Sequence, residues 1–487
     1  MSKTFYITTT LPYVNADPHV GFAMEIIRAD VIARAKLLQG YEVFFNTGTD
    51  EHGQKLFDAA KKEGKEVQEY VDQYANRFRG LKTLLGISDD VHFIRTTDAH
   101  HVASAQEFWN RCNQNGYIYK KTYQTKYCVG CELNKTDSEL NEKGECPIHP
   151  GHPVELIDEE NYFFKFSAFQ EPLLKFYNEH PQFVIPDFRF NEIKSFVASG
   201  LEDFSISRLA SKMSWGVPVP NDLDHVMYVW FDALVNYIST LGWPENTPNF
   251  EKYWVNGTPT QYCGKDNLRQ QSAMWQAMLM AADLPNSHQI VINGFITGDG
   301  GIKMSKSIGN VINPYDLVEE YGTEALRYFV LAELSSFEDS PFTMERFKEA
   351  YNAKLANGIG NLVSRIMTLS EKHIKMERVV EIATEVAQVK GANAFISRAI
   401  NDFDINFACQ MIWNGISKLD KQISEQEVFK VVKSDVPKAI TMLVDYLDKL
   451  ATIAYELEPI LPITSKKIIE IMKANKKPEK PLFLRKD

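Results

Sequence analysis

The first 53 residues alternate between strand and helix patterns, and this alternation limits the folds open to the chain. The stretch TFYITTT at residues 4–10 is rich in β-branched and aromatic residues, as strands are. An apolar helical face then recurs at spacings of three and four residues, and Gly40 ends that helix: Phe22, Ile26, Ala29, Ala33 and Leu37. The next strand lies within YEVFFNTGTDEHG, residues 41–53. The pattern predicts a βαβ unit with a right-handed crossover and a ligand site beyond the carboxyl ends of its strands.

The composition describes a globular chain without a membrane segment. Hydrophobic residues make up 44% and charged residues 24% of the 487 residues. No apolar run approaches the roughly 20 residues that span a bilayer, and the N-terminus lacks the apolar core of a signal peptide. We therefore expect a cytoplasmic protein. The formal net charge of −11 argues weakly against a general nucleic-acid binder and leaves a local basic face open.

Three of the six cysteines lie within 19 residues, in an arrangement typical of metal sites. Cys128 and Cys131 form one pair with two residues between them, and Cys146 and His149 form a second. Thiolates and an imidazole at this spacing predict a closed tetrahedral zinc site, which is structural because no coordination position stays open. His152 is an alternative fourth ligand.

Two further segments have features of polyphosphate binding. His19 and Gly21 stand where a helix begins, and the N–H groups of a helix N-terminus bind phosphate. GIKMSKSIGN, residues 301–310, holds Lys303 and Lys306 in a glycine- and serine-rich loop that can close on a leaving pyrophosphate. Each segment alone also fits an ordinary capping turn or a solvated loop. Their occurrence together in an α/β chain is far more specific.

Together these segments resemble the two signature motifs of class I aminoacyl-tRNA synthetases. Further segments are similar to the methionyl-tRNA synthetase family over nearly the whole chain, among them TTTLPYVNADPHVG, VMYVWFDAL and KMSKSIGNVINPYDLVEEYGTEALRYF. The resemblance implies an α/β fold: a doubly wound Rossmann-type catalytic domain with a zinc-containing connective insertion, followed by an all-α anticodon-binding bundle. It divides the chain into a first catalytic half (1–118), the insertion (119–223), a second catalytic half (224–292), a stem-contact region with the KMSKS loop (293–349) and the bundle (350–487).

The resemblance also implies the activity, which is ATP-dependent attachment of methionine to its cognate tRNA through a methionyl-adenylate. Magnesium is expected to accompany ATP, and zinc to be structural. The expected partners are methionine, ATP and tRNA(Met). No appended oligonucleotide-binding fold is recognised, so we expect a monomer. The tail KANKKPEKPLFLRKD is expected to be loosely held.

The site residues follow from the same resemblance, position by position. The methionine pocket is expected to comprise Leu11, Tyr13, Asp50, Trp230, Ala233, Tyr237 and Gln271, with Arg208 supporting Asp50. ATP contacts are expected from His19, Gly21, Glu25, Gly264, Lys265, Asp266, Lys303 and Lys306, of which His19, Asp266 and Lys306 are catalytic. The anticodon is expected to contact Asn361, Arg365 and Phe429. The zinc ligands are Cys128, Cys131, Cys146 and His149.

The chain departs from the family pattern at three places. Phe22 stands where the first motif has its second histidine, and we expect it to join the apolar stripe with Ile26 and Ala29. Asn267 and Gln271 replace an apolar residue and a histidine near the side-chain pocket. Phe429 stands where a tryptophan often stacks on an anticodon base.

Two other functions stay open on the sequence alone. The changes at Asn267 and Gln271 are compatible with a class I synthetase for another small or apolar amino acid. Phe22 is compatible with a non-catalytic tRNA-binding relative, although Lys306, Asp50 and Asp266 argue against that interpretation because a binding module has no use for all three.

Overall fold

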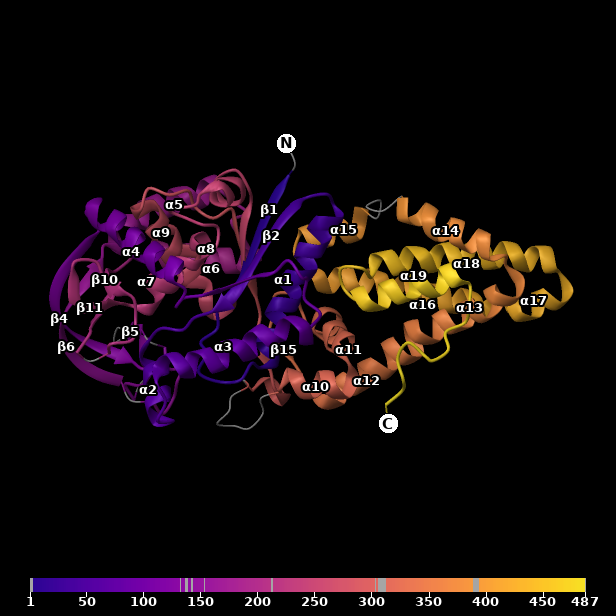
Figure 1. The fold of residues 1–487 in the computed structure, drawn as a ribbon, viewed down its shortest axis with the longest axis horizontal. Coiled ribbons are helices and arrows are strands. Elements are labelled where there is room, and N and C mark those ends of the chain that lie inside the picture. The colour runs from indigo at the N-terminus through magenta and orange to yellow at the C-terminus, as the bar shows by residue number, and fades with distance from the viewer. Residues whose placement is uncertain are drawn as a thin grey trace. The chain divides into compact units, whose positions relative to one another are not determined.

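The computed structural model describes residues 3–131, 133–135, 139–141, 143–152, 154–211, 213–302, 304, 312–388 and 394–486 (Figure 1). The chain forms two compact units that are interleaved along the sequence. The first unit comprises Met1–Pro18, Glu42–Leu81 and Asp89–Ile292. The second comprises His19–Tyr41, Lys82–Ser88 and Asn293–Asp487.

A six-stranded sheet organises the first unit. Its strand order is β3 (His92–Arg95), β2 (Glu42–Thr49), β1 (Thr4–Thr9), β12 (Pro259–Gly264), β13 (Gln289–Asn293) and β7 (Val184–Ile185). β1 pairs in parallel with β2 on one side and with β12 on the other. The order reverses between β1 and β12, which is the topological switch point of a doubly wound fold. The expected Rossmann-type sheet is therefore confirmed.

The predicted insertion contains small antiparallel sheets but also supplies one strand to the parallel sheet. β7 lies inside residues 119–223 and pairs in parallel with β13 at the sheet edge. The antiparallel strands are β4 (Ile118–Cys128), β5 (Leu133–Lys135), β6 (Val154–Phe164), β8 (Phe204–Ser205), β9 (Ser207–Leu209), β10 (Pro218–Val219) and β11 (Asp222–Met227). β4 and β6 pair along their whole length, from Ile118 with Phe164 to Cys128 with Val154. β4 and β6 thus form a long hairpin, and β5, which lies between them in sequence, pairs with the end of β4.

Aromatic rings fill the core of the first unit. Phe108 stacks on Trp275 at 5.5 Å between ring centroids and meets Phe231 and Trp243 edge-on. The helices of this unit are α2 (Gln54–Lys62), α3 (Val67–Leu84), α4 (Ala99–Gln114), α5 (Gln170–Glu179), α6 (Asp187–Ala198), α7 (Val229–Ala233), α8 (Asn236–Ser239) and α9 (Trp275–Ala281). This apolar core holds the sheet edge rigidly enough to position polar side chains at the strand ends.

The second unit is almost entirely helical. Its helices are α1 (Val20–Leu38), α10 (Pro314–Tyr321), α11 (Thr323–Tyr328), α12 (Met344–Ala350), α13 (Asn361–His373), α14 (Met376–Gln388), α15 (Ala394–Asn401), α16 (Ile405–Glu425), α17 (Val428–Ser434), α18 (Val436–Glu456) and α19 (Pro462–Ala474). The strands β14 (Ile296–Thr297) and β15 (Ser340–Pro341) pair in parallel. A π-helical segment, Tyr351–Gly360, leads into α13.

Buried charges connect α1 to the later part of the second unit. Asp30 pairs with Arg327 of α11 at 2.9 Å, and both side chains are fully buried. Arg28 donates to the carbonyls of Val330 and Ser335 at 3.0 and 2.8 Å. These contacts satisfy polar groups that would otherwise be costly to bury. The helix that directly follows β1 in sequence is therefore held by residues about 300 positions later.

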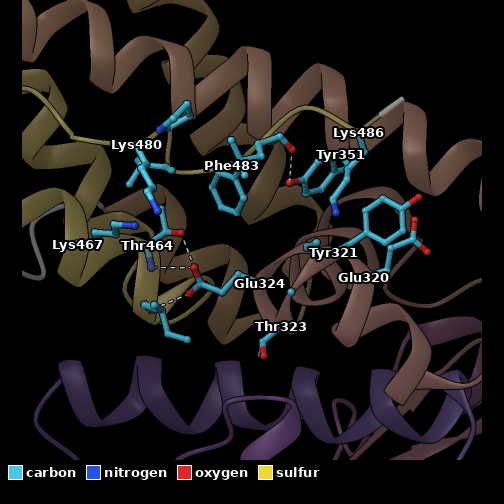
Figure 2. A pocket seen from close by; sticks show the side chains of 16 residues that line it. Glu320, Tyr321, Thr323, Glu324, Tyr351, Thr464, Lys467, Lys480, Phe483 and Lys486 are labelled. Atoms are coloured by element: carbon cyan, nitrogen blue, oxygen red, sulfur yellow. Dashed lines mark hydrogen bonds between the residues drawn. The ribbon is translucent and has the colours of Figure 1, made fainter.

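The start of α19 is also held by a buried carboxylate. Glu324 accepts hydrogen bonds from the N–H groups of Ile463 and Thr464 at 2.6 and 2.8 Å, and a further one from the Thr464 hydroxyl (Figure 2). Burial raises the pKa of Glu324. The carboxylate satisfies two of the N–H groups that every helix start leaves without an internal partner.

Two expectations about surface segments are wrong. Phe22 is only half-buried, whereas Ile26, Ala29 and Ala33 are buried and Leu37 is 45% exposed. α1 is instead buried on nearly every face from Val20 to Ala35, so its core contacts do not follow the single stripe expected from the apolar spacing. The C-terminal tail is docked, because Asn352 donates to the Lys486 carbonyl at 2.7 Å and accepts from its N–H at 3.0 Å. The Asn352 amide fixes the tail, in which charged residues and prolines flank the apolar residues 482–484.

Candidate functional site

The carboxyl ends of three adjacent parallel strands carry the expected small-molecule residues of the first unit. Leu11 and Tyr13 follow β1, Asp50 follows β2, and Gly264 ends β12. Tyr13 and Asp50 form an isolated parallel bridge, in which the Asp50 N–H donates to the Pro12 carbonyl at 2.9 Å. Asp50 is 3% exposed. A buried carboxylate at a topological switch point is suited to bind a cationic group of a ligand.

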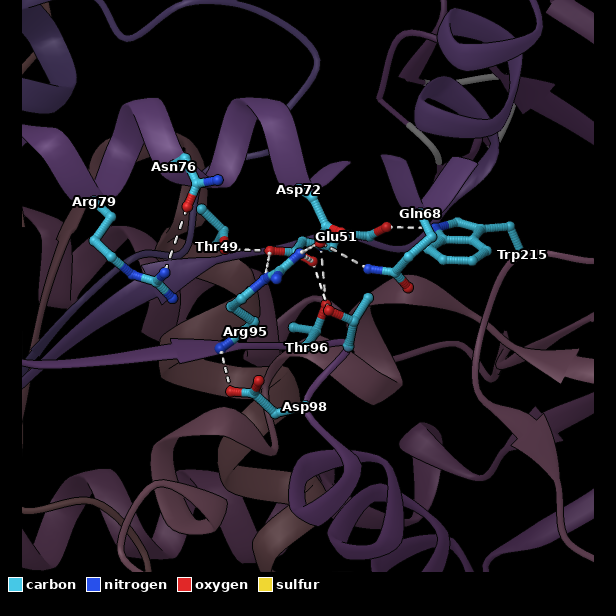
Figure 3. A network of polar contacts seen from close by, with 11 residues as sticks. Thr49, Glu51, Gln68, Asp72, Asn76, Arg79, Arg95, Thr96, Asp98 and Trp215 are labelled. Atoms are coloured by element: carbon cyan, nitrogen blue, oxygen red, sulfur yellow. Dashed lines mark hydrogen bonds and ion pairs between the residues drawn. The ribbon is translucent and has the colours of Figure 1, made fainter. Parts of the chain in front are cut away.

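A buried network around Glu51 holds this loop in place (Figure 3). Arg95 of β3 donates from Nε and Nη2 to the two Glu51 carboxylate oxygens, each at 2.7 Å. Thr49 and Thr97 add a hydroxyl donor each at 2.6 Å. The indole of Trp215 donates to the Glu51 carbonyl at 2.5 Å. Such a bidentate, fully satisfied carboxylate fixes the backbone next to Asp50.

A second buried cluster connects the Asp50 loop to α7. Asp232 accepts from His52 Nδ1 at 2.6 Å and from His101 Nε2 at 2.8 Å. His101 Nδ1 lies 2.9 Å from the Ser239 hydroxyl. Burial acts to raise the pKa of Asp232, but the two histidines outweigh it and lower the pKa to about 2. Asp232 is therefore an ionised carboxylate in the core, and it clamps the loop that carries Asp50 to the helix that carries Trp230 and Ala233.

The sequence did not predict the networks around Glu51 and Asp232, although both residues lie in segments that it marks as part of the site. GTDEHG and VWFDAL each place an acidic residue beside buried apolar positions, and buried acids are rare unless they are paired. That pairing rule was the available signal. The partners Arg95 and His101 come from other strands and helices, so only the fold identifies them.

The spacing of Trp230, Ala233 and Tyr237 fits one continuous helix, but in the structure they lie on two consecutive short helices. Trp230 and Ala233 belong to α7, and Tyr237 to α8. The helix is interrupted because the Asn236 side-chain amide donates to the Ala233 carbonyl at 2.6 Å, and Tyr237 N instead bonds Leu234 three residues back. Ala233 and Tyr237 are buried and Trp230 is half-buried. The buried Trp230 indole N–H has no hydrogen-bond partner in the described part of the chain.

Gln271 is fully buried against Tyr237. Its amide donates to the Tyr237 hydroxyl at 2.6 Å and accepts from the Gln261 amide at 2.7 Å. Gln261 in turn accepts from the Ser287 hydroxyl at 2.5 Å. The expected pocket residues Tyr237 and Gln271 are thus neighbours, and Gln261 fixes which way the Gln271 amide faces.

Arg208 of β9 lies between aromatic rings. Its guanidinium is 5.0 Å from the centroid of Tyr127 and 4.8 Å from that of Tyr228. Nη1 donates to the Ser207 carbonyl at 2.7 Å. Stacked and hydrogen-bonded, the guanidinium is held in one orientation.

The four predicted metal ligands gather at the tip of the β4–β6 hairpin. The ligand atoms of Cys128, Cys131, Cys146 and His149 all lie within 4.8 Å of one another. Cys131 Sγ is 3.3 Å from Cys146 Sγ and 3.2 Å from His149 Nδ1. A tetrahedral zinc ion with bonds of about 2.0–2.3 Å holds its ligand atoms about 3.3–3.8 Å apart. The cluster fits zinc.

Local features favour this closed cluster. A Cβ added at Gly130 would lie 2.4 Å from His149 Cγ, so only glycine lets the imidazole close over the loop. Burial acts to raise the pKa of Cys146, but hydrogen bonds from Cys131 and from the N–H groups of Ile148 and His149 outweigh it and lower the pKa. Burial raises the pKa of the neighbouring Cys131 to about 12, so Cys146 is the first of these two thiols to form the thiolate that metals bind.

The motif that contains His19 and Gly21 lies at the start of α1 and belongs to the second unit. His19 is the N-cap of α1, and its Nδ1 accepts from the Gly21 N–H at 3.1 Å. With Nδ1 as the acceptor, the N–H of the neutral ring lies on Nε2. A Cβ added at Gly21 would lie 3.0 Å from the His19 ring, so glycine permits this cap. Glu25 lies one turn further along and is buried.

Residues that follow the lysine loop contact this helix start. Lys303 and Lys306 themselves lie outside the described residues. Val20 N donates to the Ile312 carbonyl at 3.0 Å, and Ile312 is the first described residue after that loop. The other expected ATP residues, Gly264, Lys265 and Asp266, belong to the first unit. There β12 ends at Gly264, and a short 3-10 turn comprises Lys265–Asn267.

The expected anticodon residues are polar or aromatic groups at the surface of the bundle. Asn361 is the exposed first residue of α13, and Arg365 lies one turn later. Arg365 forms an ion pair with Asp420 of α16 and donates to the Ser424 hydroxyl at 3.2 Å. Phe429 on α17 is 48% exposed. An exposed ring is available for stacking on a base.

Comparison with known proteins gives consistent results. A family model described as tRNA synthetases class I (M) matches residues 5–153 and 148–367. Methionine–tRNA ligase of Thermotoga maritima is 38% identical over 98% of this chain and 76% of that protein. The Synechocystis enzyme of the same name is 39% identical over 96% and 89%. Methionyl-tRNA synthetase of Mycobacterium tuberculosis, solved in complex with methionyl-adenylate, has a TM-score of 0.86 at 34% identity, over 96% of this chain and 94% of that one.

No helix in the described ranges is both long and apolar enough to cross a bilayer.

Proposed function

This chain belongs to the methionyl-tRNA synthetase family of class I aminoacyl-tRNA synthetases, and from that premise we propose which of its residues attach methionine to tRNA. The activity is that of a methionine–tRNA ligase. Methionine attacks the α-phosphate of ATP with its carboxylate, which forms methionyl-adenylate and releases pyrophosphate. A hydroxyl of the terminal tRNA ribose then attacks the methionyl carbonyl and releases AMP.

The methionine pocket is assigned to the first unit. Asp50 pairs with the substrate ammonium, and its burial supports this role because a buried cation needs an anionic partner. Leu11 and Tyr13 line the pocket from β1, and Trp230, Ala233 and Tyr237 from α7 and α8. The thioether sulfur favours aromatic edges. Gln271 contacts the side-chain end through Tyr237, and Arg208 supports the arrangement around Asp50.

ATP contacts are assigned to two separate sets of residues. In the second unit, His19 donates from Nε2, Gly21 and Glu25 stand in the same first turns of α1, and Lys303 and Lys306 neutralise the leaving pyrophosphate. The bond between Val20 and Ile312 supports this assignment, because it holds the first described residue after the lysine loop to the start of α1. In the first unit, Gly264, Lys265 and Asp266 contact the nucleotide at the end of β12. Positioning and electrostatics lower the barrier.

The bundle is assigned to tRNA(Met). Asn361 and Arg365 hydrogen-bond unstacked anticodon bases, and Phe429 stacks on one. We keep the five-part division of the chain as a proposal, with residues 350–487 as the anticodon-binding part. We also propose a cytoplasmic monomer.

Zinc and magnesium have separate roles. The cysteine–histidine cluster is assigned a structural zinc ion, held by Cys128, Cys131, Cys146 and His149, which stabilises the loop at the hairpin tip. Among the described residues this is the one group of three or more His, Cys, Asp or Glu side chains close enough to share a metal ion. Magnesium is therefore proposed to arrive with ATP, held by its phosphates.

Metal analysis tests the zinc assignment. Wild-type protein is expected to hold one zinc ion per chain, and Cys146→Ser to lose it and to melt at a lower temperature. Cys409→Ser is the matched control, because Cys409 is a buried thiol in the bundle remote from the cluster in sequence. Zinc-free wild-type protein, or a variant that retains its zinc, would contradict the assignment.

The buried Asp50 beside Tyr13 at the switch point is the observation that carries the proposal. Pyrophosphate exchange with each of the twenty amino acids tests it. Exchange is expected with methionine and with no other amino acid. Exchange that depends on a different amino acid would assign the chain to another specificity, and absence of exchange with all twenty would remove the catalytic proposal.

A further inference from the structure

A groove in the second unit combines lysines with aromatic rings. Its volume is about 490 Å³, and it lies between α10, α11, the start of α19 and the C-terminal tail. Figure 2 shows Lys467 and Lys480 near Thr464, and Lys486 beside the rings of Tyr321 and Tyr351. None of these residues is among those assigned to methionine, ATP, zinc or the anticodon.

The tail forms one wall of the groove and is firmly seated there. The Tyr351 hydroxyl donates to the Leu484 carbonyl at 2.7 Å, and Asn352 makes two hydrogen bonds to the backbone of Lys486. The Phe483 ring meets Tyr351 edge-on at 6.2 Å. These contacts come from the π-helical segment that leads into α13. They hold the tail lysines at defined positions along the groove.

The groove is basic although the chain as a whole is acidic. Residues 466–486 contain eight lysines and arginines and two glutamates, whereas the whole chain has a net charge of −11. Two carboxylates line the groove. The Glu324 oxygens are already occupied by the N–H groups at the start of α19, which leaves Glu320 as the one exposed carboxylate of the lining, beside three lysines. Across the described residues, Lys467, Lys480 and Lys486 form no ion pair with a carboxylate. Lysines without acidic partners attract anions strongly.

The position of the groove indicates which anion it meets. Gly360 ends the segment before α13, and a Cβ added there would lie 3.7 Å from the Phe483 backbone nitrogen. The next residue is Asn361, which is assigned to the anticodon. The groove therefore borders the start of the anticodon-reading helix. A polyanion bound along that helix would lie next to the groove lysines. A lysine ammonium binds phosphate as a point charge.

We propose that this groove binds the sugar-phosphate backbone of the tRNA next to the anticodon, through Lys467, Lys480 and Lys486. The proposal rests on the assignment of the bundle to tRNA. The contacts go to phosphates, so they strengthen binding regardless of base sequence and position the RNA for Asn361 and Arg365.

Salt dependence of tRNA binding tests the proposal. Each lost phosphate contact removes about 0.7–0.9 from the slope of log affinity against log salt. Raising the salt from 50 to 200 mM lowers the tRNA affinity of the wild type by some factor. For Lys467→Gln or Lys480→Gln that factor is expected to be about threefold smaller, and for the double variant about ninefold smaller. Lys175→Gln, an exposed lysine on α5 of the first unit, is the matched control and should keep the wild-type slope.

Two further measurements make the result decisive. The loss of affinity should be equal for tRNA(Met) and for the same tRNA with an altered anticodon, and methionine-dependent pyrophosphate exchange without tRNA should be unchanged. Unchanged salt slopes in the double variant would overturn the proposal, as would slopes reduced for single-stranded poly(U) but not for tRNA. If the wild type itself lacks methionine-dependent exchange, the proposed function fails separately.

Discussion

The residues around the proposed methionine pocket in the first unit and the proposed anticodon residues in the second unit differ in how far they are buried. Asp50 and Gln271 of the proposed pocket are buried, as are Glu51 and Asp232, which hold the Asp50 loop, and Glu51, Asp232 and Gln271 have several hydrogen-bond partners each. In the bundle, Arg365 is partly exposed in an ion pair, and Phe429 is half-exposed. Removing a buried partner leaves its counterpart unsatisfied, whereas an exposed group is replaced by water. The cost of a substitution should therefore follow burial.

Asp50 should give the largest effect. Removing one partner of a buried ion pair costs about 3–5 kcal/mol, which is on the order of 10³-fold in binding. Asp50→Asn is therefore expected to lower kcat/KM for methionine by about that factor, while the Kd for ATP changes little. The measurement is pyrophosphate exchange at varied methionine, beside equilibrium ATP binding. Equal losses for both ligands would mean that the loop, and not the ammonium contact, had been damaged.

His19 sharpens the comparison because it is exposed yet expected to matter. Removing one transition-state donor costs about 10²–10³ in rate. His19→Ala should slow adenylate formation by roughly 10²-fold, the lower end of that range, with a small change in melting temperature from the lost cap. Phe22→Ala is the matched control on the same turn. Since the Phe22 ring is half-buried, it should lower the melting temperature and leave the rate nearly unchanged.

The two variants can also give the reverse result. A large rate loss with unchanged melting for Phe22→Ala would show that the ring contacts the nucleotide. Pre-steady-state adenylate formation and thermal melting together separate these outcomes.

The buried carboxylate of Asp232 should make the stability of the fold depend on pH. Its pKa is lowered to about 2, so the ionised carboxylate stabilises the fold fully above about pH 4, and that stabilisation is lost as the pH falls toward 2. The contribution is on the order of 2 kcal/mol. Asp232→Asn should be less stable than wild type at pH 5, and the gap in urea midpoint should shrink as the pH is lowered. A constant gap would contradict the assignment of the ionised clamp.

A kinetic readout separates positioning from general stability. Because Asp232 joins the Asp50 loop to α7, Asp232→Asn should raise the KM for methionine more than the KM for ATP. A uniform loss in both would indicate a purely structural role.

Arg365 should give the smallest effect. An Arg contact to a base is worth about 1–3 kcal/mol, and here the guanidinium must also leave or share Asp420. Arg365→Ala is therefore expected to lower tRNA charging roughly tenfold and to leave pyrophosphate exchange intact. Lys421→Ala, on the neighbouring surface of α16, is the control. A loss in charging as large as that of Asp50→Asn would break the relation between burial and effect.

Sequence patterns predicted those parts of the molecule that local spacing of residue types determines. The strands at residues 4–9 and 42–49 and the paired cysteines follow from periodicity and ligand spacing, and the helices after residue 350 follow from the family resemblance. The Asp232 clamp and the Arg95–Glu51 pair could not be predicted, because their partners are brought together only by tertiary packing. The docked tail was mistaken for the same reason, since Asn352 lies 134 residues from Lys486.

The interruption between α7 and α8 shows a limit of a different kind. The spacing of Trp230, Ala233 and Tyr237 fits one continuous helix. A single side-chain amide, that of Asn236, occupies the carbonyl that the helix would have used. Local competition of this sort depends on the rotamer of one residue, which hydrophobic periodicity does not record.

The buried bonds of α1 have a consequence for how the chain folds during synthesis. Arg28 donates to the carbonyl of Val330, 302 residues later. A ribosome that adds about 5–20 residues per second makes those acceptors roughly 15–60 s after the helix. During that interval the nascent chain carries Arg28 and Asp30 without their final partners, between two strands that can already pair. α1 therefore reaches its native environment only when the start of the last third of the protein has emerged.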